Sequence, residues 1–195
     1  MKKKLSRMKK PLIITLLAAL IISYYVYLTH RNVDNTDKLA GTTNELLSRD
    51  MVRNYPSDYY DVVDYFLQIQ KIIYKEDLTD DEITGYAQHM RALWDDELLA
   101  KPGNDYETYL NNLKAEIEQY KANEKYVNEY SLQRRRDVEP YTIDGKMYAR
   151  ITVKYYMREG GKLIIFYERY TLRKDTDDKW KILYWEVSDG TEMEE

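Results

Sequence analysis

The stretch KMYARITVKYYMREGGKLIIFYERYTLRK contains the pattern that most restricts the fold, two runs of alternating side chains joined by Gly160-Gly161. Two adjacent glycines favour a two-residue β-hairpin, because both central residues of that turn need a positive φ. If they form the turn, one face of the hairpin carries five opposed pairs, in which all residues but one are apolar or aromatic. The pairs are Met157 with Ile164, Tyr155 with Phe166, Val153 with Glu168, Ile151 with Tyr170, and Ala149 with Leu172.

The other face of this hairpin is basic, so we expect one face of the sheet to be core and the other to meet water. Asp144-Gly145 is a second hairpin signal, and KWKILYWEV reads as a closing strand after the acidic turn at residues 175–178. The residues after about 126 therefore predict a four-stranded antiparallel meander. The basic residues of the outer face are Arg158, Lys154, Arg150, Arg169 and Arg173.

The residues before about 126 show the helical period instead. Apolar side chains recur three and four positions apart in stretches that begin near Ser57, Thr79 and Asn104. Thr79 and Glu82 have the spacing of a capping box, and a shorter helix is predicted after Thr42. The predicted fold class is α+β, with an N-terminal transmembrane helix followed by three or four helices packed on the sheet.

Residues 11–28 carry no charged side chain and follow a basic segment. A helix of that length rises about 27 Å, close to the thickness of the hydrocarbon core of a bilayer. The basic N-terminus predicts that residues 1–10 stay in the cytoplasm and that the rest is extracytoplasmic. The alternative is a cleaved signal, but bulky residues (SYYVYLTHR) stand where small ones would be expected.

The predicted organisation along the chain follows from these patterns. Residues 1–10 are a basic cytoplasmic tail, 11–28 a membrane anchor, 29–42 a polar tether, 43–188 the α+β domain and 189–195 an acidic tail. The predicted location is the cell membrane, with a single membrane pass.

Charge and composition exclude several function classes. Seven of the 30 Lys and Arg residues lie in 1–31, which hold no Asp or Glu, so residues 32–195 carry 23 basic and 34 acidic residues, a net charge of −11. A body this acidic repels phosphate backbones, so we expect no nucleic-acid partner. The chain has no Cys, which excludes disulfides and thiolate metal sites. No phosphate-binding or metal-binding spacing is present, so we expect neither a cofactor nor a metal.

Glu168 is the most informative single residue, because the hairpin register places it on the core face between Phe166 and Tyr170. An unpaired buried carboxylate is costly, so it must find a donor or a cavity. It is either a pocket acid with a raised pKa or a structural carboxylate paired with a tyrosine or arginine. We name Glu168, Tyr170, Phe166 and His89 as candidate pocket residues.

Other polar features have simpler interpretations. His89 is either a general base in such a pocket or a boundary histidine beside the apolar stripe of its helix. Residues 134–136 are three arginines, and on a strand they would alternate between faces and pair with local acids rather than bind phosphate. We assign no catalytic residue and predict that the protein is not an enzyme.

The strands KMYARITVKYYMREGG and KLIIFYERYTLRKDTDDKWKILYWEVSD, after N-terminal helices, resemble the nuclear-transport-factor-2-like (cystatin-like cone) superfamily over roughly residues 57–188. The resemblance implies helices packed into the concave face of a bent sheet. With its predicted anchor the chain also resembles uncharacterised envelope proteins of Gram-positive bacteria and, more weakly, membrane components of type IV secretion and conjugation machines. No functional residue carries over from these resemblances.

Three functional hypotheses follow from the sequence. The preferred one is an envelope domain, anchored in the membrane, that binds another envelope protein or itself. The alternative is a small-ligand or enzymatic pocket that uses Glu168. A third is a cell-wall glycan binder, in which some of the 21 tyrosines stack on sugars.

Overall fold

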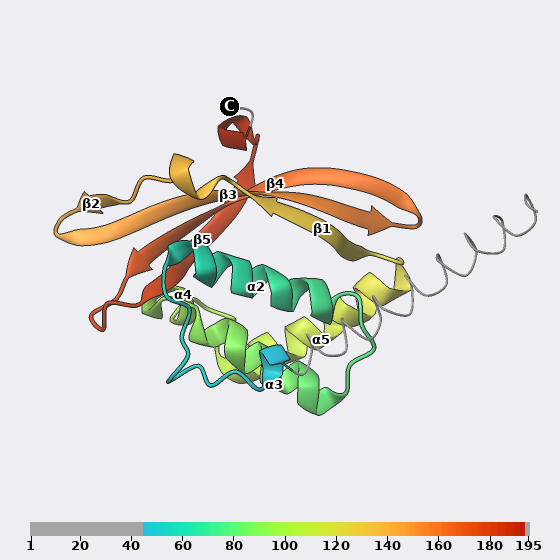
Figure 1. Cartoon of the computed structure of the whole chain (residues 1–195). Helices are drawn as coiled ribbons and strands as arrows, with labels where there is room; N and C mark the ends of the chain where they lie inside the picture. Colours follow the sequence, from blue (N-terminus) through green and yellow to red (C-terminus); the bar gives the residue numbers. More distant parts are fainter. Residues whose placement is uncertain (1–44, 194–195) are drawn as a thin grey trace, which may run out of the picture. The chain divides into compact units, whose positions relative to one another are not determined.

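The computed structural model describes residues 45–193, and in this part of the chain helices cover one face of an antiparallel sheet of five strands (Figure 1). Helix α2 lies against the sheet, and α3 and α5 lie on the far side of α2. The domain is therefore α+β. The helices are α2 Tyr59–Ile73, α3 Asp80–Ala92, α4 Asp96–Leu99 and α5 Tyr106–Ala122.

The helix starts follow local capping chemistry. The capping box predicted at the start of α3 is confirmed, because the Thr79 side chain and the Glu82 side chain each bond the backbone of the other residue. The sequence predicts helix starts near Ser57 and Asn104, and the caps are the next residues, Asp58 for α2 and Asp105 for α5. In both cases the carboxylate one position later accepts hydrogen bonds from the first free N–H groups.

The long hairpin has the predicted register. Strands β3 (Lys146–Glu159) and β4 (Lys162–Lys174) pair Val153 with Glu168 and Tyr155 with Phe166, together with the other expected partners. Gly160 and Gly161 have φ of +52° and +78°, the left-handed values that this turn needs. Tyr170, Leu172 and most of their β3 partners are buried against the helices, so the face predicted as core is the core.

The predicted four-stranded meander is wrong, because the expected first strand is divided in two. The parts are β1 (Tyr126–Leu132) and β2 (Tyr141–Ile143), which pair with different halves of β3. Between them a short 3-10 helix, Arg135–Asp137, carries the chain away from the sheet. Arg135 binds the carboxylates of Asp58 and Asp61 at the start of α2, so the arginine triplet is not on a strand but does pair with local acids.

The last strand, β5 (Trp180–Ser188), contains a bulge that changes which residues face the helices. Ile182 lies opposite Leu172, but Tyr184 lies opposite Thr171, so Leu183 is the extra residue. Strict alternation from Ile182 would turn Trp185 outward. Because the bulge shifts the alternation by one residue, Trp185 points to the core face instead.

The C-terminal residues fold back onto the sheet face that the helices leave uncovered (Figure 1). A 3-10 helix, Thr191–Met193, brings Glu192 to Arg169 on β4 and to the Thr152 hydroxyl on β3. Gly190 packs against the ring of Tyr167. The residues predicted as an acidic tail thus make specific contacts with the outer face.

Within residues 45–193, no helix is both long and apolar enough to cross a bilayer. The predicted membrane segment, 11–28, its basic flank and the tether lie outside the described residues.

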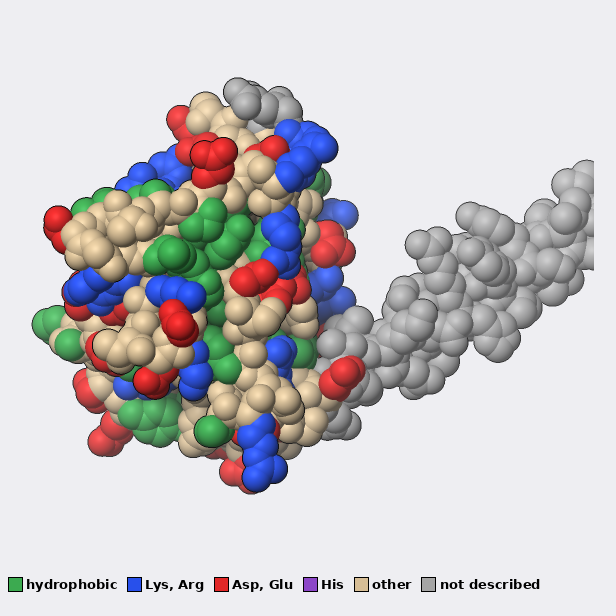
Figure 2. Space-filling model, turned by 60° about the vertical axis from the view of Figure 1, so that its left-hand side comes forward, with side chains coloured by type: hydrophobic (Ala, Val, Ile, Leu, Met, Phe, Trp, Pro, Cys, Tyr) green, Lys and Arg blue, Asp and Glu red, His purple; other side chains and the backbone are tan. Residues whose placement is uncertain are grey.

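Figure 2 shows that, on one face of the molecule, hydrophobic side chains gather in a central band bordered by charged side chains of both signs.

Candidate ligand-binding cavity

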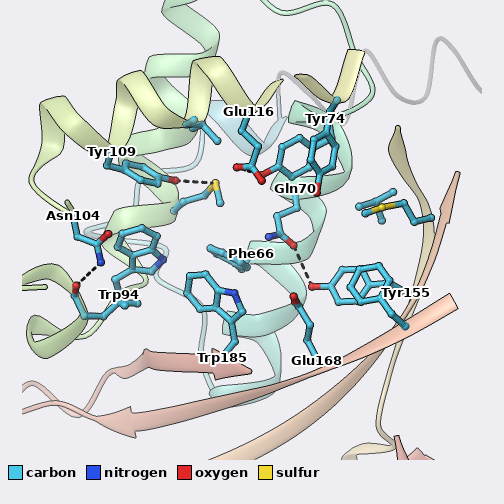
Figure 3. Close-up of a pocket in the computed structure, with 17 residues that line it drawn as sticks. Phe66, Gln70, Tyr74, Trp94, Asn104, Tyr109, Glu116, Tyr155, Glu168 and Trp185 are labelled. Carbon is cyan, nitrogen blue, oxygen red and sulfur yellow. Dashed lines mark hydrogen bonds between the residues drawn. The ribbon is translucent and has the colours of Figure 1, made fainter. Parts of the chain in front are cut away.

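A cavity of about 400 Å³ lies between the helices and the core face of the sheet (Figure 3). Its volume falls in the range of small-molecule sites, roughly 300 to 1,000 Å³. Helices α2, α3, α4 and α5 and strands β1, β3, β4 and β5 all contribute to its walls. The residues that line it are Phe66, Gln70, Tyr74, Met90, Trp94, Leu98, Asn104, Tyr109, Leu113, Glu116, Tyr120, Val127, Tyr155, Met157, Phe166, Glu168 and Trp185.

Aromatic rings form much of the wall. Trp94 lies edge-on to Tyr109, with ring centres 4.8 Å apart, and Tyr155 stacks on Phe166 at 4.7 Å. Trp185, turned inward by the bulge, lies 6.1 Å from Trp94. These rings come from α5, β3, β4, β5 and the segment between α3 and α4, so aromatic side chains from both layers of the domain form the walls of the cavity.

Glu168 belongs to a hydrogen-bonded chain on the sheet side of the cavity. The Tyr170 hydroxyl lies 3.0 Å from the Glu168 carboxyl and 2.6 Å from the Tyr155 hydroxyl, which in turn lies 3.2 Å from the Gln70 amide oxygen. Burial raises the pKa of Glu168, and its hydrogen bonds with Tyr170 and Tyr155 oppose part of that rise. The carboxyl therefore binds a proton more tightly than an exposed glutamate does.

The hydroxyl groups of this chain hold the Glu168 carboxyl in place. Tyr170 donates a hydrogen bond to Glu168, and in the contact between the Tyr155 and Tyr170 hydroxyls either oxygen can be the donor. Glu168 is therefore fixed on the sheet side of the cavity by a neighbour on its own strand.

A second carboxylate, Glu116 on α5, enters from the opposite wall (Figure 3). It accepts a hydrogen bond of 2.9 Å from the Tyr74 hydroxyl, and Tyr74 stacks on Tyr120 with ring centres 4.2 Å apart. Burial, together with the negative charges of Glu116, Glu168 and Glu159, raises the pKa of Tyr120 to about 12. Both carboxyl groups thus act on the same end of the cavity.

The other end of the cavity holds an unpaired donor. The indole Nε1 of Trp94 is buried and has no hydrogen-bond partner among the described residues. Figure 3 shows this nitrogen on the cavity side of the ring. A buried N–H without an acceptor costs free energy, so an acceptor brought by a ligand would be favoured there.

The structure separates the four candidate residues named from the sequence. Glu168 and Phe166 line the cavity, and Tyr170 is fully buried beside it, where its hydroxyl contacts Glu168. His89 is not part of the cavity. Its Nδ1 lies 2.7 Å from the hydroxyl of Tyr65 on α2, and burial, with the nearby Arg49, lowers its pKa.

Several cavity residues were missed by the sequence analysis. Trp94, Tyr109 and Tyr120 stand at helical spacing among apolar residues, and nothing in such a pattern distinguishes a core ring from one that faces a cavity. Glu116 had one usable signal, since it shares a helix face with Leu113 and Tyr120. No sequence signal marks Trp185 as a cavity residue, because the direction of its side chain depends on the bulge.

A second hollow, of about 550 Å³, lies between the β2–β3 turn and the acidic loop before β5. Charges of both signs line it, and four of them form the ion pairs Arg173 with Asp95 and Lys174 with Asp178. The described residues contain no group of three or more His, Cys, Asp or Glu side chains that could hold a metal ion. The aromatic cavity is therefore the stronger candidate site.

A protein-family model described as "Domain of unknown function (DUF6715)" matches residues 1–185. The comparison with curated proteins finds no match.

Proposed function

The chain belongs to the DUF6715 family, whose description assigns no activity, and we therefore propose from its geometry that the domain binds a small molecule in the helix–sheet cavity. One observation carries this proposal: a void of about 400 Å³, walled by aromatic rings, has a partly buried carboxyl on its sheet side. Concave apolar sites with a few polar groups are the usual form of small-molecule sites.

The packing around the cavity supports this proposal. Protein interiors are normally filled to the density of organic crystals, so a half-open hollow of this size between the helices and the sheet is a departure from normal packing. The rings that line it pack on one another, as in the stacked pair Tyr155 and Phe166. A ligand that fills the space would restore the lost contacts.

The proposal is tested with benzyl alcohol, a neutral, water-soluble probe, titrated into the full chain in a maltoside detergent. Trp94 and Trp185 line the cavity, so we expect a saturable change in tryptophan emission. Leu113→Phe enlarges a buried lining residue and should weaken binding, whereas Leu163→Phe, on an exposed residue of the hairpin tip, should not. Absence of saturable binding, or equal binding by Leu113→Phe once its folding is verified, contradicts the proposal.

We further propose the location indicated by residues 1–31: the cell membrane, with the domain outside. The basis is the basic flank and the charge-free residues 11–28, together with the resemblance to envelope proteins. Protease added to whole cells should remove the C-terminal domain. Protection of that domain, or its release into the medium, would show the location to be wrong.

The preferred hypothesis from the sequence, an interaction or assembly domain, stays a prediction, as do the cone-superfamily resemblance and the absence of catalysis. Crosslinking in intact membranes should trap a specific protein if the domain works by association. Recovery of the chain alone would count against that role and leave the ligand-binding proposal standing.

A further inference from the structure

The charged side chains that line the cavity are all acidic. Its charged residues, among those described, are Glu116 and Glu168, and none is Lys, Arg or His. The two acids approach from opposite walls, α5 and β4, and both raise the pKa of Tyr120. Glu168 is partly buried, where Coulomb attraction is stronger than in water, and Glu116 is exposed at the edge of the cavity, so this end favours a positive group.

The aromatic walls favour the same kind of group. The face of an aromatic ring is electron-rich and attracts cations within about 6 Å, and sites for quaternary ammonium groups are often built from such rings. Phe66, Tyr155 and Trp185 lie around Glu168 (Figure 3), and Phe166, which also lines the cavity, stacks on Tyr155. Tyr120 contributes little to this effect, because Tyr74 covers one of its faces and Lys125 lies over the ring at 4.7 Å.

The opposite end of the cavity favours an acceptor rather than a cation. The unpaired Nε1 of Trp94 lies there, and the Arg91 guanidinium carbon is 5.8 Å from the centre of the Trp94 ring. Arg91 donates to the carbonyl of Asn104 and does not line the cavity. Its charge repels a second cation at this end but is compatible with an oxygen atom bonded to the indole N–H.

We infer that the ligand is an organic ammonium ion that also carries a hydroxyl or carbonyl oxygen, with its cationic group between Glu116 and Glu168 and its oxygen at Trp94. This inference rests on the proposed binding function. It names the class of ligand, which the cavity alone leaves open.

Choline and two molecules of the same shape test the inference. In 3,3-dimethylbutan-1-ol a carbon replaces the choline nitrogen, so the shape and hydroxyl remain but the charge is lost; 3,3-dimethylbutyrate is negative. We expect the full chain in maltoside detergent to bind choline at least about tenfold more tightly than the neutral alcohol, and the anion more weakly still. Tetramethylammonium, which has no oxygen, should bind more weakly than choline.

Variants assign the counter-ions. Glu168→Gln and Glu116→Gln keep the size of each side chain and remove its charge, and each should lower the preference for choline over the neutral alcohol by several-fold. Glu118→Gln, on an exposed residue two positions from Glu116 on α5, is the matched control and should leave the preference unchanged. Trp94→Phe should remove the advantage of choline over tetramethylammonium.

The pH dependence gives a second readout. Choline has no ionisable group in the range from about pH 5.5 to about pH 8, so a change in its affinity belongs to the protein. The titratable groups that face Glu168 are Glu116 and four tyrosines, Tyr74, Tyr120, Tyr155 and Tyr170. The pKa of each tyrosine is raised, so the four hydroxyls stay neutral in this range. Affinity for choline should rise with pH as Glu168 loses its proton, and Glu168→Gln should abolish this rise.

The outcomes separate the two proposals. Equal binding of choline and 3,3-dimethylbutan-1-ol, or preference for the anion, overturns the inference about charge while the binding function stands. Saturable binding of no probe, benzyl alcohol included, overturns both. A choline preference that survives Glu168→Gln and Glu116→Gln unchanged also overturns the inference, since the cation would then lie elsewhere.

Discussion

Replacing Arg173 by Met should destabilise the domain by about 3 kcal/mol, because it leaves a buried carboxylate without its cation. Arg173 bonds Asp95 through two nitrogens, at 3.0 and 2.5 Å, and the two side chains are 12% and 4% exposed. Removing one partner of a buried ion pair typically costs about 3 to 5 kcal/mol. The lower figure applies here because the backbone N–H of Glu97 still donates to Asp95 at 2.9 Å.

The reverse change should cost less. Asp95→Asn keeps an acceptor for the Glu97 N–H, and Arg173 retains the Glu97 carboxylate at 2.7 Å, so we expect a loss of about 1 to 2 kcal/mol. In the double variant the penalty of the unpaired charge disappears. The two changes should therefore couple by about 1.5 kcal/mol or more, which a double-mutant cycle measures.

The assay is urea unfolding of the full chain, followed by tryptophan emission. For a domain of this size about 3 kcal/mol corresponds to a fall in Tm of roughly 6 to 12 °C, and the midpoint should move without a change in slope. The loss of this ion pair should also disturb the cavity wall. The backbone N–H of Asp95 donates to the carbonyl of Ile182 on β5, and Ile182 pairs with Trp94. A loss below about 1 kcal/mol for Arg173→Met, with no coupling to Asp95→Asn, would refute the reasoning.

Three further predictions concern stability. Burial raises the pKa of Glu168, so the stability that it contributes is fully present below its unfolded pKa and is lost as pH rises through its folded value. Glu168→Gln should therefore be more stable than wild type at neutral pH, and its Tm should fall less than that of wild type as the pH is raised above the ordinary glutamate pKa of about 4.3. Gly190→Ala places a Cβ 2.5 Å from the Tyr167 ring at a φ of +79° and should destabilise the domain by about 2 kcal/mol. The control Gly103→Ala, where the φ is +84° and no atom lies within 4 Å, should cost about 1 kcal/mol. Equal losses in urea unfolding would show that the Tyr167 contact is harmless. Thr79→Ala removes the capping box of α3 and should cost about 1 kcal/mol, and an unchanged urea midpoint would contradict this.

The residues of the long hairpin were predicted well because local physics decides them. A two-residue glycine turn sets the register, and a strand repeats every two residues, so the pairing of Val153 with Glu168 follows from the turn alone. The capping box of Thr79 and Glu82 is equally local. The division of the first strand was missed because it depends on Arg135 reaching Asp58 and Asp61, about 75 residues earlier in the chain.

The sequence by itself determined the secondary-structure classes, the core face of the hairpin and the unusual position of Glu168, because these depend on side-chain period and on turn residues. Tertiary structure alone decided that this carboxyl borders a void, that a bulge at Leu183 turns Trp185 into it, and that His89 faces Tyr65 instead. A void exists only where elements distant in sequence fail to fill the space between them. Such a failure of packing is a property of the assembled layers and leaves no periodic signal in the chain.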